Sequence, residues 1–108
     1  MIDNIIKILD KAVVEDIAIY DMRSITPFYD TCIIGSVHSS RQGNAAVNYL
    51  KKEAPLLGYE LRSYHAMPDT KWFLVDLNDI VIHIFVGDER QRYNLDGMCS
   101  VYPIVHNL

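Results

Sequence analysis

Three side chains in the second half of the sequence have the chemistry of metal ligands or proton carriers. Asp76, Asp79 and His83 fall within one short segment, and carboxylate oxygens together with an imidazole nitrogen can bind a metal or transfer a proton. Asp79 lies in a predicted turn, and no second His or Cys follows at the spacing of a ligand. We therefore expect hydrogen-bonding roles for these side chains, with no metal and no cofactor.

The cysteines do not form a pattern that is typical of catalysis. Cys32 lies in the apolar run from Thr31 to Ile34, where a buried and unreactive thiol is expected. Cys32 and Cys99 are too few for a disulfide framework and do not form a Cys-x-x-Cys pair. Both are expected to be reduced, which is the usual state of cysteines in a cytoplasmic protein.

The segment from Gly35 to Arg41 has the residues of a weak anion-binding turn. It lies between a predicted strand and a predicted helix, so its backbone amides, together with Ser39, Ser40 and Arg41, could hold a phosphate. It lacks the glycine and lysine spacing of a P-loop and also the Rossmann fingerprint. Capping of the helix by Ser39 or Ser40 is the alternative role.

A glycine and a serine after a strand are also similar to the sheet of nucleotidyltransferases. Those enzymes carry an Asp-x-Asp pair on the following strands, and this sequence has none. The alternative to a protein without catalytic activity is therefore an enzyme of this ancestry, active or degenerate, that binds nucleotides through the turn from Gly35 to Arg41.

The composition is that of a single folded domain spanning residues 1–108. Of the 108 residues, 50% are hydrophobic and 22% are charged, which suffices for one core in a chain too short for two. The 14 acidic and 10 basic residues give a net charge of −4, which disfavours DNA as a partner and favours a basic protein. No apolar stretch reaches the ~20 residues of a membrane span, and the acidic N-terminus is unlike a signal peptide. A cytoplasmic location is expected.

Apolar periodicity predicts helices and strands that alternate along the chain. The expected helices cover residues 2–13, 40–53 and 88–95, and the expected strands cover 17–20, 31–34, 59–64, 72–77 and 80–86. Pro55 is expected to stop the second helix near Glu53, and Gly97 to end the third. The order indicates an α/β fold with a mixed sheet of about five strands and flanking helices. An irregular tail is expected at about residues 100–108.

The two strands before and after Asn78-Asp79 are predicted to form a hairpin with two different faces. Leu77 lies opposite Ile80, so the isoleucines of the second strand join the Phe73, Val75 and Leu77 row on a purely apolar face. The other face carries Trp72, Leu74, Asp76, Val81, His83 and Phe85. Two interpretations stay open: an aromatic, partly wet surface that binds a partner, or a face covered by helices in which Asp76 bonds a neighbouring backbone amide.

Several runs of residues, in order and at fixed spacings, resemble the ribosomal silencing factor family, RsfS/Iojap. They are Asp30-Thr-Cys-Ile-Ile-Gly-Ser-Val-His-Ser-Ser-Arg41, Trp72-Phe-Leu-Val-Asp-Leu-Asn-Asp-Ile-Val-Ile-His-Ile-Phe85, Glu89-Arg90 and Tyr93-Asn-Leu-Asp96. The resemblance covers about residues 1–98, and the segment from Trp72 to Tyr93 is its most specific part.

The resemblance implies a protein without catalytic activity that binds the large ribosomal subunit at a basic ribosomal protein on the intersubunit face. It would block the joining of the small subunit and repress translation under nutrient limitation. The implied fold is similar to nucleotidyltransferases without their catalytic aspartate pair. The implied partner-binding residues are Trp72, Asp76, His83, Phe85, Glu89 and Tyr93. A homodimer formed through the same aromatic face is a further expectation for the unbound protein.

The sequence departs from the usual pattern of that family at three places. It has His65-Ala66 where an acidic residue and a glycine are usual, Asn78 where the hairpin turn usually has a glycine, and Met98-Cys99 where an aromatic residue usually closes the last helix. Asn accepts a positive φ, so the turn is expected to form.

Overall fold

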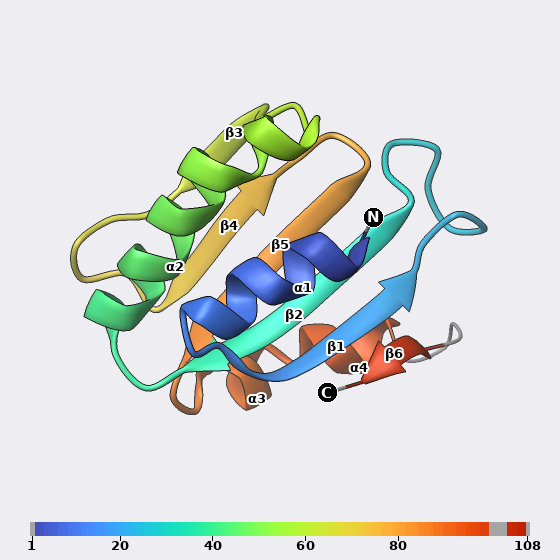
Figure 1. The fold of residues 1–108 in the computed structure, drawn as a ribbon. Coiled ribbons are helices and arrows are strands. Elements are labelled where there is room, and N and C mark those ends of the chain that lie inside the picture. The colour runs from blue at the N-terminus through green and yellow to red at the C-terminus, as the bar shows by residue number, and fades with distance from the viewer. Residues whose placement is uncertain (1, 100–103, 108) are drawn as a thin grey trace.

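The protein folds as alternating helices and strands around one sheet (Figure 1), as seen in a computed structural model that describes residues 2–99 and 104–107. The helices are α1 (Ile2–Lys11), α2 (Ser40–Glu53), the 3-10 turn η1 (Pro55–Leu57), α3 (Glu89–Tyr93) and α4 (Leu95–Cys99). The strands are β1 (Glu15–Asp21), β2 (Thr31–Val37), β3 (Ser63–His65), β4 (Trp72–Asp76), β5 (Ile80–Val86) and β6 (Ile104–Asn107).

The strands form one mixed sheet in the order β3-β4-β5-β2-β1-β6. β2 and β5 are parallel, and every other pair of neighbours is antiparallel. The prediction of an α/β fold with a mixed sheet of about five strands is confirmed, and β6 extends that sheet by pairing with β1. The irregular tail expected at 100–108 therefore includes a strand, whereas residues 100–103 and 108 lie outside the described part of the chain.

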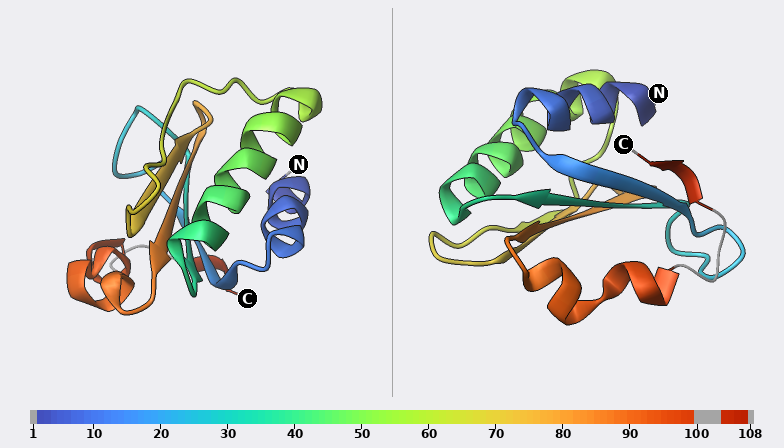
Figure 2. Two further views of the ribbon diagram at one scale, coloured as in Figure 1. Left: turned by 90° about the vertical axis from the view of Figure 1, so that its left-hand side faces the viewer. Right: turned by 90° about the horizontal axis from the view of Figure 1, so that it is seen from below.

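The two faces of the sheet are covered differently. Figure 2 shows α1 and α2 together on one face and the short α3 and α4 on the other. The main core lies under α1 and α2, where Ile5, Leu9, Leu50, Phe73 and Ile82 are completely buried. A smaller apolar cluster lies under α3 and α4. On this face Leu74, Asp76, Val81 and His83 stay partly exposed.

The ends of α2 follow from local sequence chemistry. The Ser39 hydroxyl accepts a hydrogen bond from the Gln42 amide at 3.1 Å, and this cap satisfies an N–H that has no partner within the helix. Pro55 ends the regular helix after Glu53, and the chain continues as a 3-10 turn. Gly58 then adopts a φ of 92°, which suits a residue without a Cβ. The predicted cap by Ser39 and the predicted end near Glu53 are thus confirmed.

Two expected elements differ in the structure. The strand expected at 59–64 is reduced to β3. The Tyr59 amide bonds the Ala54 carbonyl at 3.2 Å, so this part of the chain still belongs to the turn after α2 and the strand begins only at Ser63. The helix expected at 88–95 is broken at Asn94, whose φ of 52° ends α3 before α4 begins. Gly97 lies inside α4, where a Cβ would approach the Asn94 side chain to 2.3 Å.

None of the helices in the described ranges combines the length and the apolar character needed to cross a membrane.

Candidate partner-binding surface

The hairpin of β4 and β5 places its side chains as the alternation of the sequence predicts. Trp72 pairs with Phe85 and Asp76 pairs with Val81. The Leu77 amide donates to the Ile80 carbonyl at 2.8 Å, and Asn78 in the turn has a φ of 73°. The apolar row packs under α2 and α1, and the other row faces the side of α3 and α4.

Four aromatic rings gather at the end of this second face, and we call them the aromatic cluster: Trp72, His83, Phe85 and Tyr93. The centroid of the Trp72 ring lies 4.6 Å from that of Tyr93, 4.9 Å from that of Phe85 and 5.9 Å from that of His83. Phe85 is completely buried, Trp72 and His83 are partly buried, and Tyr93 is 49% exposed. The cluster thus has a buried base and an accessible outer side.

A hydrogen bond fixes the orientation of the tryptophan. The Trp72 Nε1–H donates to Nδ1 of His83 over 3.1 Å. An imidazole that accepts at Nδ1 is neutral and carries its proton on Nε2. Burial lowers the pKa of His83 to about 4, because the surrounding side chains disfavour the charged ring. His83 therefore acts as a neutral acceptor that positions Trp72.

A shallow pocket opens beside the aromatic cluster. It has a volume of about 240 Å³ and is lined by His65, Thr70, Trp72, Leu74 and His83. The lining comes from β3, β4 and β5 and the loop before β4, where no helix of the described chain covers the sheet. Hydrocarbon and aromatic groups in a small open pocket are typical of a place where a partner inserts a side chain.

His65, Thr70 and Leu74 were not among the site residues predicted from the sequence. Leu74 could have been found, because alternation already put it on the same face as Trp72. His65 could not, because its position depends on β3 pairing with β4 so that His65 faces Leu74. Thr70 accepts a hydrogen bond from Ser40 at its carbonyl oxygen, over 2.7 Å, and so ties the loop before β4 to the start of α2.

Arg90 is a further residue of this region, and the sequence analysis predicted no function for it. Its guanidinium makes two hydrogen bonds to the Asp96 carboxylate, at 2.8 and 2.9 Å, and two more to the Ser36 hydroxyl and the Asp16 carbonyl, at 3.0 and 2.6 Å. Tyr20 donates to the same carboxylate over 2.7 Å. This network binds α3 and α4 to β1 and β2, and thereby holds Tyr93 against Trp72.

The two carboxylates that were predicted to face a partner have different surroundings. Asp76 accepts a hydrogen bond from the Asn78 amide at 2.9 Å, the backbone contact that was considered for it, and stays partly exposed. Glu89 lies 3.5 Å from Arg92, and its side chain is mostly covered. Both side chains are thus partly exposed.

The structure combines the two interpretations of the hairpin face. The part of this face around Phe85, near the end of β5, is covered by α3 and α4. Leu74, Asp76, Val81 and His83 stay partly exposed. Phe85 requires a correction, because a completely buried ring has no surface to offer a partner. It instead supports Trp72 from below.

The two serines of the predicted anion-binding turn bond to the protein itself, one as a helix cap and one in a loop contact. Ser39 caps α2, Ser40 donates to the Thr70 carbonyl, and Arg41 points to solvent as an exposed side chain. The alternative role, capping, is thus confirmed for Ser39. No contact of Arg41 supports a phosphate site.

A cavity of about 450 Å³ lies at the carboxyl ends of the parallel strands β2 and β5, where α/β folds commonly bind ligands. Its lining includes the carboxylates of Glu15, Asp16, Asp88 and Asp96 together with Arg90. Arg90 is already bonded to Asp96, so the remaining charge of this cavity repels a phosphate. Within residues 2–99 and 104–107, no group of three or more His, Cys, Asp or Glu side chains is placed to hold a metal.

The sequence is similar to those of ribosomal silencing factors. A family profile described as "Ribosomal silencing factor during starvation" matches residues 1–103. The chain is 33% identical over 90 residues to the ribosomal silencing factor RsfS of Bacillus subtilis, covering 83% of this chain and 76% of that protein. It is 32% identical over 97 residues to RsfS of Halalkalibacterium halodurans, covering 90% and 83%.

Solved structures show the same fold. A crystal structure of a Bacillus halodurans protein superposes with a TM-score of 0.82 at 30% identity, covering 97% of this chain and 95% of the other. A Chromobacterium violaceum protein superposes with a TM-score of 0.83 at 23% identity, covering 93% and 87%; this second likeness concerns the fold alone.

Proposed function

The chain belongs to the ribosomal silencing factor family, and on this premise we propose that it binds the large ribosomal subunit through the surface around Trp72. Its contact there is a basic ribosomal protein on the intersubunit face. Bound in that place, it prevents the small subunit from joining and represses translation when nutrients are limiting. The function needs no catalysis, in keeping with relatives named as silencing factors.

The observation that carries the proposal is the half-open aromatic cluster. Trp72 and Tyr93 present accessible ring surface, and the pocket beside Trp72 can receive an apolar side chain. Partly exposed Trp and Tyr on a rigid base are the usual anchors of protein interfaces, because they bury a large area with little loss of conformational entropy. The strands and the Arg90 network supply that rigid base.

The charges of the molecule suit a basic partner. The net charge is −4, and Asp76 lies on the open part of the same face as Trp72. A carboxylate at the rim of an interface mainly raises the association rate and fixes orientation, while the aromatic anchors supply affinity. Binding is therefore expected to weaken as the salt concentration rises.

Sedimentation with separated ribosomal subunits tests the proposal. The tagged protein is expected to move with the large subunit in a sucrose gradient. Trp72→Ala removes the central anchor and is expected to weaken binding by more than about 1 kcal/mol, or roughly fivefold. Tyr49→Ala, on α2 at the opposite face of the sheet, is a control that removes an exposed aromatic ring away from the surface around Trp72 and is expected to bind normally.

Trp72 also packs inside the domain, so a second variant is needed. Leu74→Lys changes a partly exposed residue of the pocket and brings a positive charge to the face that should meet a basic protein. It is expected to fold, as judged by circular dichroism, and to bind less well. Sedimentation with the small subunit, or with neither subunit, would contradict the proposal.

Self-association through the aromatic cluster is the second candidate for the same surface. A half-open apolar face can pair with a copy of itself in the absence of another partner. Light scattering distinguishes the two cases, because a dimer formed through this face would be lost in Trp72→Ala and displaced by large subunits.

A further inference from the structure

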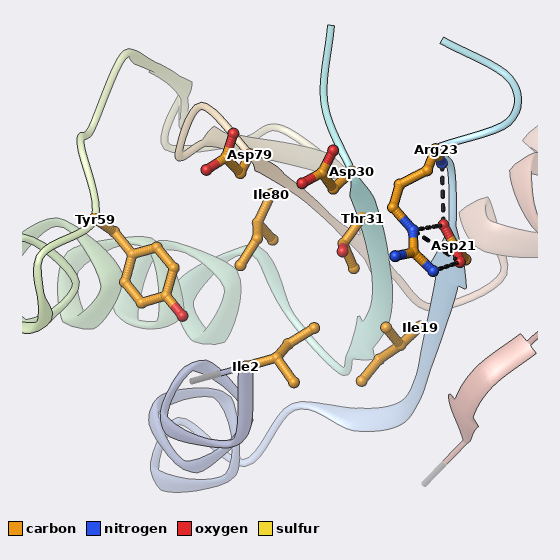
Figure 3. A pocket seen from close by; sticks show the side chains of 9 residues that line it. All are labelled: Ile2, Ile19, Asp21, Arg23, Asp30, Thr31, Tyr59, Asp79 and Ile80. Atoms are coloured by element: carbon orange, nitrogen blue, oxygen red, sulfur yellow. Dashed lines mark hydrogen bonds and ion pairs between the residues drawn. The ribbon is translucent and has the colours of Figure 1, made fainter. Parts of the chain in front are cut away.

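A third open space, again a cavity, lies at the end of the sheet away from Trp72, beside the start of β2 and β5 (Figure 3). Its volume is about 390 Å³, which lies in the range of cavities that take up small ligands or single side chains. The lining consists of Ile2, Ile19, Asp21, Arg23, Asp30, Thr31, Tyr59, Asp79 and Ile80. It shares no residue with the pocket beside Trp72.

One side of this cavity is hydrocarbon and aromatic. Ile19 and Ile80 belong to the buried core, while Ile2 and Tyr59 are partly buried and pack against it. Figure 3 shows the three isoleucine side chains and the Tyr59 ring around the open space. Such a wall can pack against a methylene chain or a flat delocalised group.

The other side of the cavity is acidic. The backbone amides of Asp30 and Thr31 both bond the Asp79 carbonyl, at 2.9 and 3.1 Å, and this brings the Asp30 and Asp79 residues side by side at the rim (Figure 3). Both are exposed. Their carboxylates therefore form an accessible negative edge above the apolar wall.

Among the described residues that line this cavity, the cation is Arg23, and a neighbour holds it. Arg23 bonds Asp21 through its Nε at 2.9 Å and through a second nitrogen, and this contact lowers the pKa of Asp21 to about 2. Since Asp21 offsets Arg23, the described lining residues keep a net charge of about −2 from Asp30 and Asp79. A cation is favoured in this cavity, and an anion is not.

The loop that borders the cavity exposes apolar side chains. Residues 22–30 are closed into a loop by a bond from the Met22 amide to the Asp30 carbonyl at 2.8 Å. Within it, Phe28 is 79% exposed and Ile25 is 36% exposed. Exposed apolar side chains on a loop that borders an acidic cavity add contact area that a small ion would not use, and such area is typical of a protein interface.

We propose that this cavity is a second docking site, which takes up an arginine side chain from a basic protein segment while the flanking loop contacts the rest of that segment. The methylene stem of the arginine packs on the isoleucines. The guanidinium lies near the Tyr59 ring and pairs with Asp30 and Asp79. Arginine combines an apolar stem, a flat cation that stacks on aromatic rings and a paired contact with carboxylates. This site is separate from the aromatic cluster and does not depend on ribosome binding.

An NMR titration of the ¹⁵N-labelled protein tests this site without the ribosome. The probe is the capped tripeptide Leu-Arg-Leu, and the matched probe is Leu-citrulline-Leu, which has the same shape without the charge. The arginine peptide is expected to shift the amide signals of Thr31, Asp79 and Ile80 in a saturable way. The citrulline peptide is expected to bind at least about fivefold more weakly, since each exposed ion pair contributes up to about 1 kcal/mol.

Variants of the chain identify the carboxylates. Asp30→Asn combined with Asp79→Asn is expected to weaken binding of the arginine peptide about tenfold, and Asp69→Asn, on the loop before β4, is expected to leave it unchanged. The backbone bonds of Asp30 and Asp79 do not involve their carboxylates, so the double variant should keep the wild-type spectrum elsewhere. Equal binding of the two peptides, unchanged binding to the double variant, or shifts that do not saturate would overturn the proposal. Trp72→Ala should bind the peptide normally.

Discussion

The hydrogen bond between Trp72 and His83 links an interface anchor to a titratable group. The indole N–H can be accepted by His83 only when its Nδ1 is unprotonated. Protonation would place two N–H donors face to face in a partly buried site. A neutral histidine is therefore part of the folded state, and the orientation of Trp72 depends on it.

This contact predicts a pH dependence of stability. Burial lowers the pKa of His83 to about 4 in the folded protein, whereas an unfolded histidine has a pKa of about 6.5. Between these values the unfolded chain binds a proton that the folded protein does not, so the free energy of unfolding falls as the pH falls from about 6.5 to 4. The loss amounts to about 3 kcal/mol at most. Chemical denaturation at a series of pH values measures it.

The control for this prediction is His83→Asn, which keeps an acceptor for the indole N–H but does not titrate. The variant is expected to show a flatter stability curve between pH 4 and 6.5 while retaining most of its stability at pH 7. A curve with the same slope as the wild type would show that His83 is not responsible.

The candidate surface could be predicted at the level of residues where only local alternation mattered. Trp72, Asp76 and His83 share a face because they alternate along two strands joined by a tight turn. The burial of Phe85 and the role of Arg90 could not be predicted. Both depend on where α3 lies, and Arg90 contacts Ser36 and Asp16, 54 and 74 positions away in the sequence.

At the level of elements, α3 and α4 are too short to be stable alone. Arg90 connects them to the sheet through Asp96, Ser36 and the Asp16 carbonyl. Burial alone would raise the pKa of Asp96, but hydrogen bonds from Arg90 and Tyr20 outweigh it and lower that pKa. The Arg90 guanidinium is therefore the main polar link between these helices and the sheet, and the Tyr20 hydroxyl adds to it.

Replacing that guanidinium should loosen the two helices. Arg90→Ala leaves the Asp96 carboxylate partly buried without its main partner, and the free energy of unfolding is expected to fall by about 3 kcal/mol. Hydrogen exchange measured by NMR should show lost protection at residues 90–98 and little change in β4. The conservative variant Arg90→Lys keeps the positive charge and is expected to recover part of the stability. Recovery should be incomplete, because one ammonium cannot make the paired contact with the carboxylate. Uniform loss of protection across the sheet would contradict a local anchoring role.

The contact between α2 and β4 depends on a glycine. A Cβ added at Gly43 would lie 2.2 Å from the Phe73 ring, which is completely buried. Gly43→Ala is thus expected to lower the free energy of unfolding by about 1–3 kcal/mol, although alanine favours a helix more than glycine does. Thermal unfolding measures the effect.

A smaller residue opposite should restore the fit. In the double variant Gly43→Ala with Phe73→Leu, the added methyl group has space, and the double variant should be more stable than the sum of the two single changes predicts. Additive losses would show that Gly43 is not selected by this contact.

Element boundaries could be predicted where a residue with a strong local preference sets them. Pro55 ends α2, Ser39 begins it, and Asn78 makes the hairpin turn. β6 could not be predicted, since pairing with the outer edge of β1 defines it rather than any pattern of its own. The break at Asn94 was missed because Gly97 had the stronger local signal for a helix end.

At the scale of the whole molecule, the two candidate surfaces lie at different ends of the sheet. The aromatic cluster is at the Trp72 end of the hairpin, and the acidic cavity is near the Asn78 turn at the other end. The domain measures 34 × 33 × 22 Å. One end can therefore face the large subunit while the other stays accessible to a second partner.

These dimensions predict a steric effect on subunit joining. Even the shortest extent of 22 Å far exceeds the distance of about 3 Å at which two surfaces form hydrogen bonds. A molecule bound on the intersubunit face must then hold the subunits apart. Light scattering after rapid mixing of the subunits should show that the amount of joined ribosomes falls in proportion to the fraction of large subunits occupied by the protein.

The salt dependence of binding and of subunit joining shows whether bound protein is what blocks joining. At fixed magnesium, higher monovalent salt is expected to release the acidic protein, since screening shortens the Debye length to about 8 Å at 0.15 M, and joining should recover with the same salt dependence as binding. Asp76→Asn should weaken that salt dependence, whereas Trp72→Ala should lower binding at every salt concentration. If the large subunit is fully occupied and joining is nevertheless normal, the protein docks at a place where it does not separate the subunits, and steric repression is wrong.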